Sequence, residues 1–143
     1  MNCWTNRQAL LFSESVRPLF HPALDEISVE GVLHALSDPV RVAIYAGVAA
    51  AQCPQTCSSF LRVSEKSIPK STLSQHFKAL REAGLIRSER CGVEMHNTSR
   101  CAEIDRRFPG LIKSIINSYK VQLEGKARPR GGGKAKRARP GGR

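Results

Sequence analysis

Features that mark membrane and secreted proteins are missing from this sequence. No apolar run approaches the roughly 18 residues that a membrane-spanning helix needs. The N-terminus has no basic segment followed by an apolar core and a small-residue cleavage site, as secretory leaders have. The five cysteines are odd in number and irregular in spacing, which argues against a disulfide framework. We therefore expect a cytoplasmic protein.

Motifs that carry catalysis are missing as well. The sequence contains no glycine-rich phosphate loop, no nucleophile elbow and no HExxH zinc motif. Acid–base chemistry would have to use scattered side chains such as Glu82, Glu89, Glu94 and His96, and the last three fall in a predicted hairpin. We therefore expect a binding protein that is not an enzyme and that holds no cofactor.

Acidic residues are also few. Twelve Asp and Glu stand against 23 Lys and Arg, which gives a net charge of +11. Eight of the basic residues and no acid fall in residues 125–143, so residues 1–124 keep a charge of only +3. The tail is built mainly from Gly, Lys, Arg and Pro, and we expect it to be disordered. This charge favours a polyanionic partner such as nucleic acid.

The most informative stretch runs from Pro69 to Leu85. Leu73, Phe77 and Leu80 recur at the spacing of one helical face. Pro69 is typical of a first helical turn, and Gly84 is typical of the left-handed residue that ends a helix. The opposite face is polar and cationic, with Ser71, Ser74, Gln75, Lys78 and Arg81. Such a helix fits the major groove of DNA, although a solvated surface helix explains this stretch alone equally well.

A hairpin is predicted directly after this helix. Residues 85–90 and 93–98 form two extended runs around Cys91-Gly92, a two-residue turn that contains glycine. A helix followed by a basic hairpin is typical of a recognition helix and a wing. The fold class is therefore mainly α with a small β-hairpin, a winged helix-turn-helix DNA-binding domain.

Two helices are predicted upstream. Val29, Val32, Leu33 and Leu36 are spaced as one helical face, and Ser28 is suited to cap that helix. Asp38-Pro39 predicts the N-cap and first position of a second helix, over residues 39–51. Its expected buried stripe contains Val40, Ile44, Tyr45, Val48 and Ala51.

Further helices are predicted on either side of the recognition helix and hairpin. Cys53-Pro54 starts a new unit, and Cys57, Phe60 and Leu61 favour a short third helix. A helical turn over residues 102–108 ends at Pro109-Gly110, and a last helix begins at Leu111. The apolar stripe of this last helix is too broad for packing on one neighbour, so it calls for a partner surface.

Two segments together resemble a known family. Residues 33–41 read LHALSDPVR, and residues 71–86 read STLSQHFKALREAGLI. The combination of ALSDPxR with STxSxHxxxLxxAGL resembles the ArsR family of bacterial winged-helix transcriptional repressors, over residues 27–120. The resemblance implies homodimers that are joined through the first and last helices and bind palindromic operators until an inducer acts. The expected dimerisation residues are Val29, Val32, Leu33, Leu111, Ile112, Ile115, Ile116 and Tyr119.

Roles at the DNA follow from side-chain chemistry. Gln75 and Ser74 face outward near the helix start, where Gln can bridge two atoms of adenine. Phosphate contacts suit Ser71, Lys78 and Arg81, which hold register without reading sequence. The remaining candidates are Lys70, Thr72, His76, Arg87 and Arg90. His76 lies near DNA by resemblance but would equally pack on a neighbouring helix, and the two wing arginines would equally form a solvated hairpin edge.

The cysteines are the candidate residues for sensing the signal that releases the DNA. Founding family members sense metals through a C-x-C pair in the third helix or through His and acidic ligands in the last, and this chain has neither pattern. If Pro54 opens a helix, Cys53 and Cys57 converge and the helix N-terminus lowers a thiol pKa. That arrangement suits a reversible disulfide, an arsenical or a soft metal. Core packing of Cys57 beside Phe60 is the simpler interpretation, and two thiols leave a zinc site incomplete, so no metal is predicted.

Three segments are therefore expected: a flexible N-terminal extension over residues 1–20, a winged-helix DNA-binding and dimerisation domain over residues 21–124, and a disordered basic tail over residues 125–143. The predicted function is a homodimeric repressor that a signal releases from an inverted-repeat operator in double-stranded DNA. One alternative is a general nucleic-acid-binding protein that acts through its tail. The other is a repressor that senses redox state or metal through Cys53 and Cys57.

Overall fold

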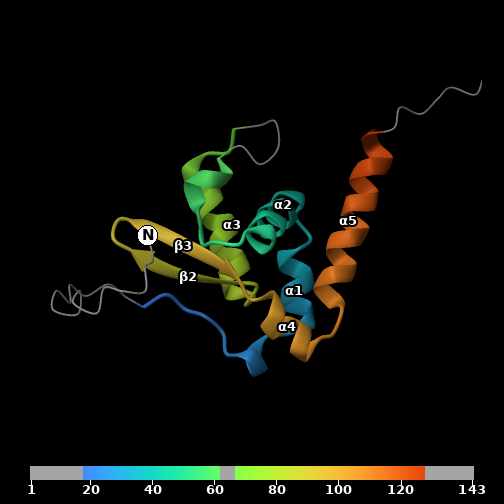
Figure 1. Ribbon diagram of the computed structural model, residues 1–143, viewed down its shortest axis with the longest axis horizontal. Coiled ribbons are helices and arrows are strands. Elements are labelled where there is room, and N and C mark those ends of the chain that lie inside the picture. Colours follow the sequence, from blue (N-terminus) through green and yellow to red (C-terminus); the bar gives the residue numbers. More distant parts are fainter. Residues whose placement is uncertain (1–17, 62–66, 128–143) are drawn as a thin grey trace, which may run out of the picture.

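The computed structural model describes residues 18–61 and 67–127 of the chain (Figure 1). The predictions for residues 1–17 and for residues 128–143 lie outside the described residues. Within the described ranges, none of the helices has both the length and the apolar character needed to cross a membrane.

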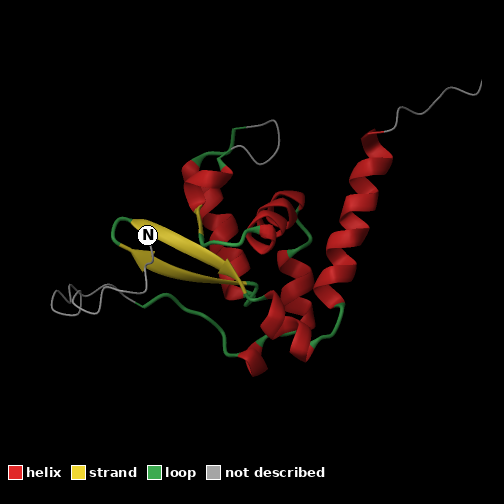
Figure 2. Ribbon diagram, in the orientation of Figure 1, coloured by secondary structure: helices red, strands yellow, loops and turns green. Residues whose placement is uncertain are grey.

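Helices dominate the fold, and a small antiparallel sheet projects from one side of it (Figure 2). The elements are the 3-10 helix η2 (Leu24–Glu26), α1 (Val29–Ala35), α2 (Pro39–Ala50), β1 (Gln55–Thr56), the 3-10 helix η3 (Cys57–Phe60), α3 (Lys70–Glu82), β2 (Ile86–Cys91), β3 (Glu94–Ser99), α4 (Cys101–Arg107) and α5 (Leu111–Ala127). The strand order is β1-β3-β2, and the β2–β3 hairpin lies opposite α5 in Figure 1.

The starts of α1 and α2 confirm the predicted caps. The Ser28 hydroxyl accepts a hydrogen bond from the Gly31 N–H at 3.1 Å, and the Asp38 carboxylate accepts from Val40 at 2.7 Å. These side chains satisfy backbone donors that the first helical turn leaves unpaired. Pro39 is the first residue of α2, and the helix ends at Ala50, one residue earlier than predicted.

A short third helix is present as the 3-10 helix η3 (Cys57–Phe60), but it does not begin at Pro54. Residues 55 and 56 instead form β1, which pairs antiparallel with β3, so Gln55 lies opposite Asn97. The Asn97 side chain holds this pairing by donating to the Gln55 carbonyl at 3.1 Å. A partner 42 residues away therefore overrides the local helical pattern, and only the short η3 follows.

The hairpin is confirmed, with its turn shifted by one residue. Cys91 pairs with Glu94, so the two-residue turn is Gly92-Val93 instead of Cys91-Gly92. Gly92 has a φ of +62°, which suits the first position of a type II′ turn and which L side chains rarely adopt.

α3 packs its apolar face into the core and ends as predicted at Gly84, which has a φ of +78°. The Leu85 N–H donates to the Leu80 carbonyl at 3.0 Å, and the Gly84 N–H donates to the Arg81 carbonyl at 2.9 Å. This pair of bonds is the Schellman arrangement that terminates a helix and turns the chain. The chain enters β2 directly, so the position of the hairpin depends on this helix end.

α5 is the least buried of the long helices. Only Ile112 on it is fully buried, while Val121 and Leu123 are exposed. The helix continues to Ala127, past residue 124, where the folded domain was expected to end. The core gathers buried side chains from α1, α2, η3, α3, β2, α4 and, through Ile112, α5.

Candidate nucleic-acid interface

The outer face of α3 has the composition that the sequence predicted. Leu73, Phe77 and Leu80 are 2%, 3% and 0% exposed, so they anchor the inner face. Phe77 meets Phe60 of η3 edge to face, with ring centroids 5.7 Å apart. The exposed residues of the outer face are Lys70, Ser71, Thr72, Ser74, Gln75 and Lys78. They form one continuous surface that can donate hydrogen bonds and carries positive charge.

Two residues of α3 are less available than the sequence suggested. His76 is half-buried, and so is Arg81. The Arg81 Nε is buried and has no hydrogen-bond partner among the described residues. The Arg81 charge acts on the imidazole of His21 and on the thiol of Cys57, so this side chain lies against the body of the protein. A simple phosphate contact is therefore a poorer description of Arg81 than of Lys78.

Lys78 lies 3.8 Å from Glu82, one helical turn along the same exposed face. Exposed pairs of this kind contribute little to stability, because water and salt screen them. The Lys78 ammonium therefore stays available to a phosphate.

The two wing arginines differ in position. Arg90 is exposed one residue before the end of β2, and within the described residues it makes no ion pair. Arg87 lies at the base of the hairpin, where its guanidinium pairs with the Glu103 carboxylate of α4 at 3.5 Å. Arg87 therefore connects the wing to α4, whereas Arg90 faces outward. Val93 at the tip of the hairpin is fully exposed, which the sequence did not predict.

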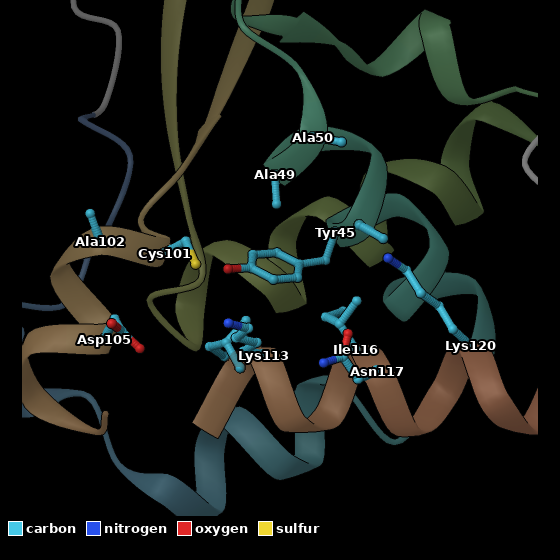
Figure 3. Close-up of a pocket in the computed structure, with 12 residues that line it drawn as sticks. Tyr45, Ala49, Ala50, Cys101, Ala102, Asp105, Lys113, Ile116, Asn117 and Lys120 are labelled. Carbon is cyan, nitrogen blue, oxygen red and sulfur yellow. The ribbon is translucent and has the colours of Figure 1, made fainter. Parts of the chain in front are cut away.

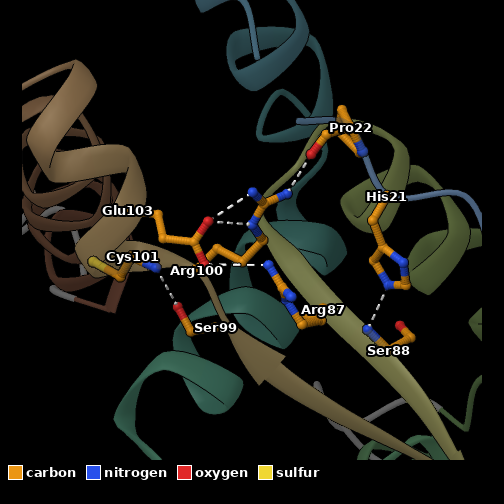
Figure 4. Close-up of polar contacts among 8 residues, drawn as sticks. All are labelled: His21, Pro22, Arg87, Ser88, Ser99, Arg100, Cys101 and Glu103. Atoms are coloured by element: carbon orange, nitrogen blue, oxygen red, sulfur yellow. Dashed lines mark hydrogen bonds and ion pairs between the residues drawn. The ribbon is translucent and has the colours of Figure 1, made fainter. Parts of the chain in front are cut away.

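A polar cluster behind the wing was also missed from the sequence (Figure 4). His21 belongs to the N-terminal arm, here residues 18–23, and its Nε2 accepts the backbone N–H of Ser88 in β2 at 2.9 Å. Its Nδ1 donates to the Leu19 carbonyl at 3.0 Å, so the ring is neutral. Burial lowers the pKa of His21, and the charges of Arg81, Arg87 and Arg100 lower it further, while the Leu19 bond opposes them.

Arg100 holds the same arm from the other side. Its side chain is only 4% exposed, and its Nη1 donates to the Pro22 carbonyl at 2.7 Å. The Nε and Nη2 atoms donate to one oxygen of Glu103, at 3.1 and 2.7 Å. These bonds hold the pKa of Glu103 below its usual range. The cluster connects the arm, the wing and α4.

The thiols do not form the arrangement that a helix at Pro54 would create. Cys53 is exposed, and Cys57 is half-buried beside the Asn97 amide, which donates to its sulfur at 3.6 Å. Burial raises the pKa of the Cys57 thiol, which is opposite to the predicted lowering. Among the residues with described positions, no three His, Cys, Asp or Glu side chains are grouped as metal ligands.

The candidate dimer residues divide into two groups. Val32 is 0% exposed and Ile112 is 4% exposed, so both lie in the core of their own chain and offer no surface to a partner in this conformation. Leu33 is 49% exposed. The half-buried members of the set are Val29, Leu111, Ile115, Ile116 and Tyr119. Periodicity did not separate these groups, because inner and outer apolar residues share one broad stripe.

Residues 36–89 match a family of helix-turn-helix domains. No curated protein matches the sequence significantly. Six solved chains match significantly by structure. One is an ArsR-like transcriptional regulator from Rhodococcus sp. RHA1, with 25% sequence identity, a TM-score of 0.46 and coverage of 69% of this chain and 92% of that chain.

The matched segment contains α2 and α3 with the connection between them, and the hairpin that follows supplies the wing. The two sequence patterns that resemble the ArsR family run from the end of α1 into α2, and along α3 to the start of β2. The chain therefore contains a helix-turn-helix domain, which the hairpin extends to a winged helix-turn-helix fold.

Proposed function

We propose that this protein is a homodimeric repressor that binds an inverted-repeat operator and is released by a signal. The observation that carries the proposal is the exposed polar and cationic face of α3 beside a wing with an outward arginine. An α-helix of this kind fits the major groove, and phosphate contacts on either side would fix its register. We place this repressor in the cytoplasm and assign it no catalytic group.

Base reading is assigned to Gln75 and Ser74. Both are exposed on the first two turns of α3, where a recognition helix reaches base edges. Phosphate contacts are assigned to Lys70, Ser71, Thr72 and Lys78, which surround them on the same face. Arg90 would reach the backbone or the minor groove next to the wing.

Dimerisation is supported by apolar surface that the single chain leaves uncovered. Leu33 of α1 and Leu123 of α5 are 49% and 51% exposed, and Ile115 is half-buried. A two-fold arrangement would cover these residues with their own copies. It would also present two α3 helices about one turn of DNA apart, roughly 34–36 Å.

The test is selection of bound duplexes from random DNA, followed by affinity measurements. We expect an imperfect inverted repeat that binds far more tightly than its scrambled sequence. The substitution Gln75→Ala should relax the preference at one position in each half-site and weaken binding by about 1–3 kcal/mol. The matched substitution Lys78→Ala should weaken all duplexes alike and reduce the salt dependence. An unchanged base preference in Gln75→Ala would remove Gln75 from base reading.

Two other functions make different predictions. A general nucleic-acid-binding protein acting through the basic tail would bind unrelated duplexes almost equally. A thiol-sensing repressor would release its operator when Cys53 and Cys57 are oxidised or bind a soft metal. The raised pKa of Cys57 disfavours the second function, because the thiolate is the reactive form.

A further inference from the structure

A hollow of about 700 Å³ lies between α2, α4 and α5, away from the outer face of α3 (Figure 3). Its size is within the roughly 300–1,000 Å³ typical of small-molecule sites. The hollow exists because α2 presents Ala46, Ala49 and Ala50 toward α5, and these short side chains do not fill the space between the helices.

The walls are mainly apolar. Ile112 and Ile116 of α5 face the alanines of α2 across the hollow. Tyr45 closes its inner end, and the Tyr45 hydroxyl lies 3.3 Å from the Ser99 hydroxyl. An apolar body of several carbon atoms would bury its surface here favourably.

The polar side chains at the rim are unevenly charged. Lys113 and Lys120 extend from α5 at this site, and Lys120 reaches toward α2 in Figure 3. Neither lysine has an ion-pair partner within 4.0 Å in the described ranges. The rim carboxylate is Asp105, and one of its oxygens already accepts the Gly110 N–H at 2.9 Å. The rim therefore favours an anion.

We infer that this hollow is a binding site for a small organic carboxylate with an apolar body. The apolar body lies between the α2 alanines and Ile116, and the carboxylate lies against Lys113 and Lys120. Charge-assisted bonds from two ammonium groups at an apolar site select carboxylates over alcohols and amines of the same shape.

The position of the site suggests what its occupation does, and this step rests on the proposed function. α2 packs on α3, while α5 carries apolar surface suited to a partner subunit. A ligand between α2 and α5 would change the position of α3, the recognition helix, relative to the dimer axis. If the ligand binds more tightly to the α2–α5 spacing of the DNA-free protein, it weakens operator binding. By linkage, the operator then weakens ligand binding by the same factor.

The test uses octanoate as the probe, with octylamine and 1-octanol as matched probes of other charge. Calorimetry on the full chain without DNA should show one saturable octanoate site per chain and much weaker binding of the other two. The double substitution Lys113→Gln/Lys120→Gln should weaken octanoate binding about tenfold. The control Lys126→Gln removes an exposed charge from the same helix outside the hollow and should leave octanoate binding unchanged.

A second variant tests the apolar part of the site. Ala49 is exposed, so Ala49→Phe fills the hollow without entering the core and should abolish octanoate binding. Absence of saturable octanoate binding, or equal binding of octylamine, would overturn the inference. Dissociation of the dimer by Ala49→Phe in sedimentation would also overturn it, because a second copy would then occupy the hollow.

Operator affinity with and without octanoate tests regulation separately. We expect a weakening of about tenfold or more at saturation. Specific octanoate binding with unchanged operator affinity would retain the site and overturn its regulatory role. Loss of operator recognition in the absence of octanoate would instead be a failure of the proposed function.

Discussion

The imidazole of His21 accepts the backbone N–H of Ser88 at 2.9 Å, across 67 residues of sequence. β2 is an edge strand of the sheet, so among the described strands none pairs with this N–H on its outer side. The N-terminal arm supplies that partner and covers the back of the wing. Arg100 fixes the same arm through Pro22, which makes the arm part of the wing's support.

Stability should depend on the protonation of His21. Its folded-state pKa lies below the ordinary histidine value of about 6.5, so the unfolded chain binds the proton more readily. The stabilisation is therefore complete above about pH 6.5 and is lost as the pH falls from there through the folded-state pKa. Protonation of the His21 ring removes its hydrogen bond with the Ser88 N–H, and losing one such bond lowers the unfolding free energy by about 1 kcal/mol. Urea unfolding between pH 5 and pH 8 measures this slope.

The variant His21→Ala should lose most of that pH dependence and show faster hydrogen exchange at the Ser88 amide. The control His34→Gln changes an exposed histidine of α1 and should keep the wild-type slope. A wild-type slope in His21→Ala would assign the pH dependence to other groups.

Gly84 should tolerate no side chain. A Cβ there would lie 2.5 Å from Ile27 Cγ1 and 3.2 Å from Pro22 Cγ, and the backbone has a φ of +78°. We expect Gly84→Ala to cost about 2–4 kcal/mol in unfolding free energy, from strain and overpacking together. Gly92→Ala is the matched control, because its φ is +62° but no atom lies within 4 Å of the added Cβ. Gly92→Ala should lower the unfolding free energy by about 1–2 kcal/mol. An equal loss in the two variants would show that overpacking against Ile27 and Pro22 contributes nothing at Gly84.

Dimerisation should depend on the half-buried side of α5. The substitution Ile115→Glu would bury an unpaired charge at a subunit interface, so we expect a monomer that has lost operator binding. Ser114→Glu places the same charge at an exposed neighbouring position and should remain dimeric. Sedimentation measures the oligomeric state of both variants. A folded dimer of Ile115→Glu would exclude this side of α5 as the interface.

The thiols should differ in reactivity. Cys53 is exposed, whereas burial raises the pKa of Cys57, so iodoacetamide should modify Cys53 first in the folded protein. Operator affinity should not change on oxidation or with zinc, cadmium or arsenite. Release of DNA under any of these conditions, absent in Cys57→Ser, would support the thiol-sensing alternative.

The basic tail should add affinity without specificity. Ending the chain after Ala127 keeps α5 complete and removes seven Lys and Arg residues. We expect weaker binding to all duplexes, a shallower salt dependence and the same preferred sequence, because flexible cations neutralise phosphates without reading bases. A changed consensus in the random-DNA selection would show that the tail contributes to recognition.

The sequence by itself determined the elements whose signals are local. The Asp38 cap, the α3 stripe ending at Gly84 and the glycine turn of the hairpin each depend on interactions within a few residues. For the same reason the sequence identified the outer face of α3, including Gln75 and Lys78. These features were enough to indicate a winged helix.

Only the tertiary structure decided which residues contact partners that are distant in the sequence. β1 forms at Gln55 because β3 pairs with it, and Arg87 forms an ion pair with Glu103 of α4. His21 gained its role from Ser88, and Val32 was separated from Leu33 by the packing of its own chain. Helical periodicity reports which face is apolar but not what covers it, so neither the core residues of that stripe nor the hollow beside Ala49 follows from the sequence.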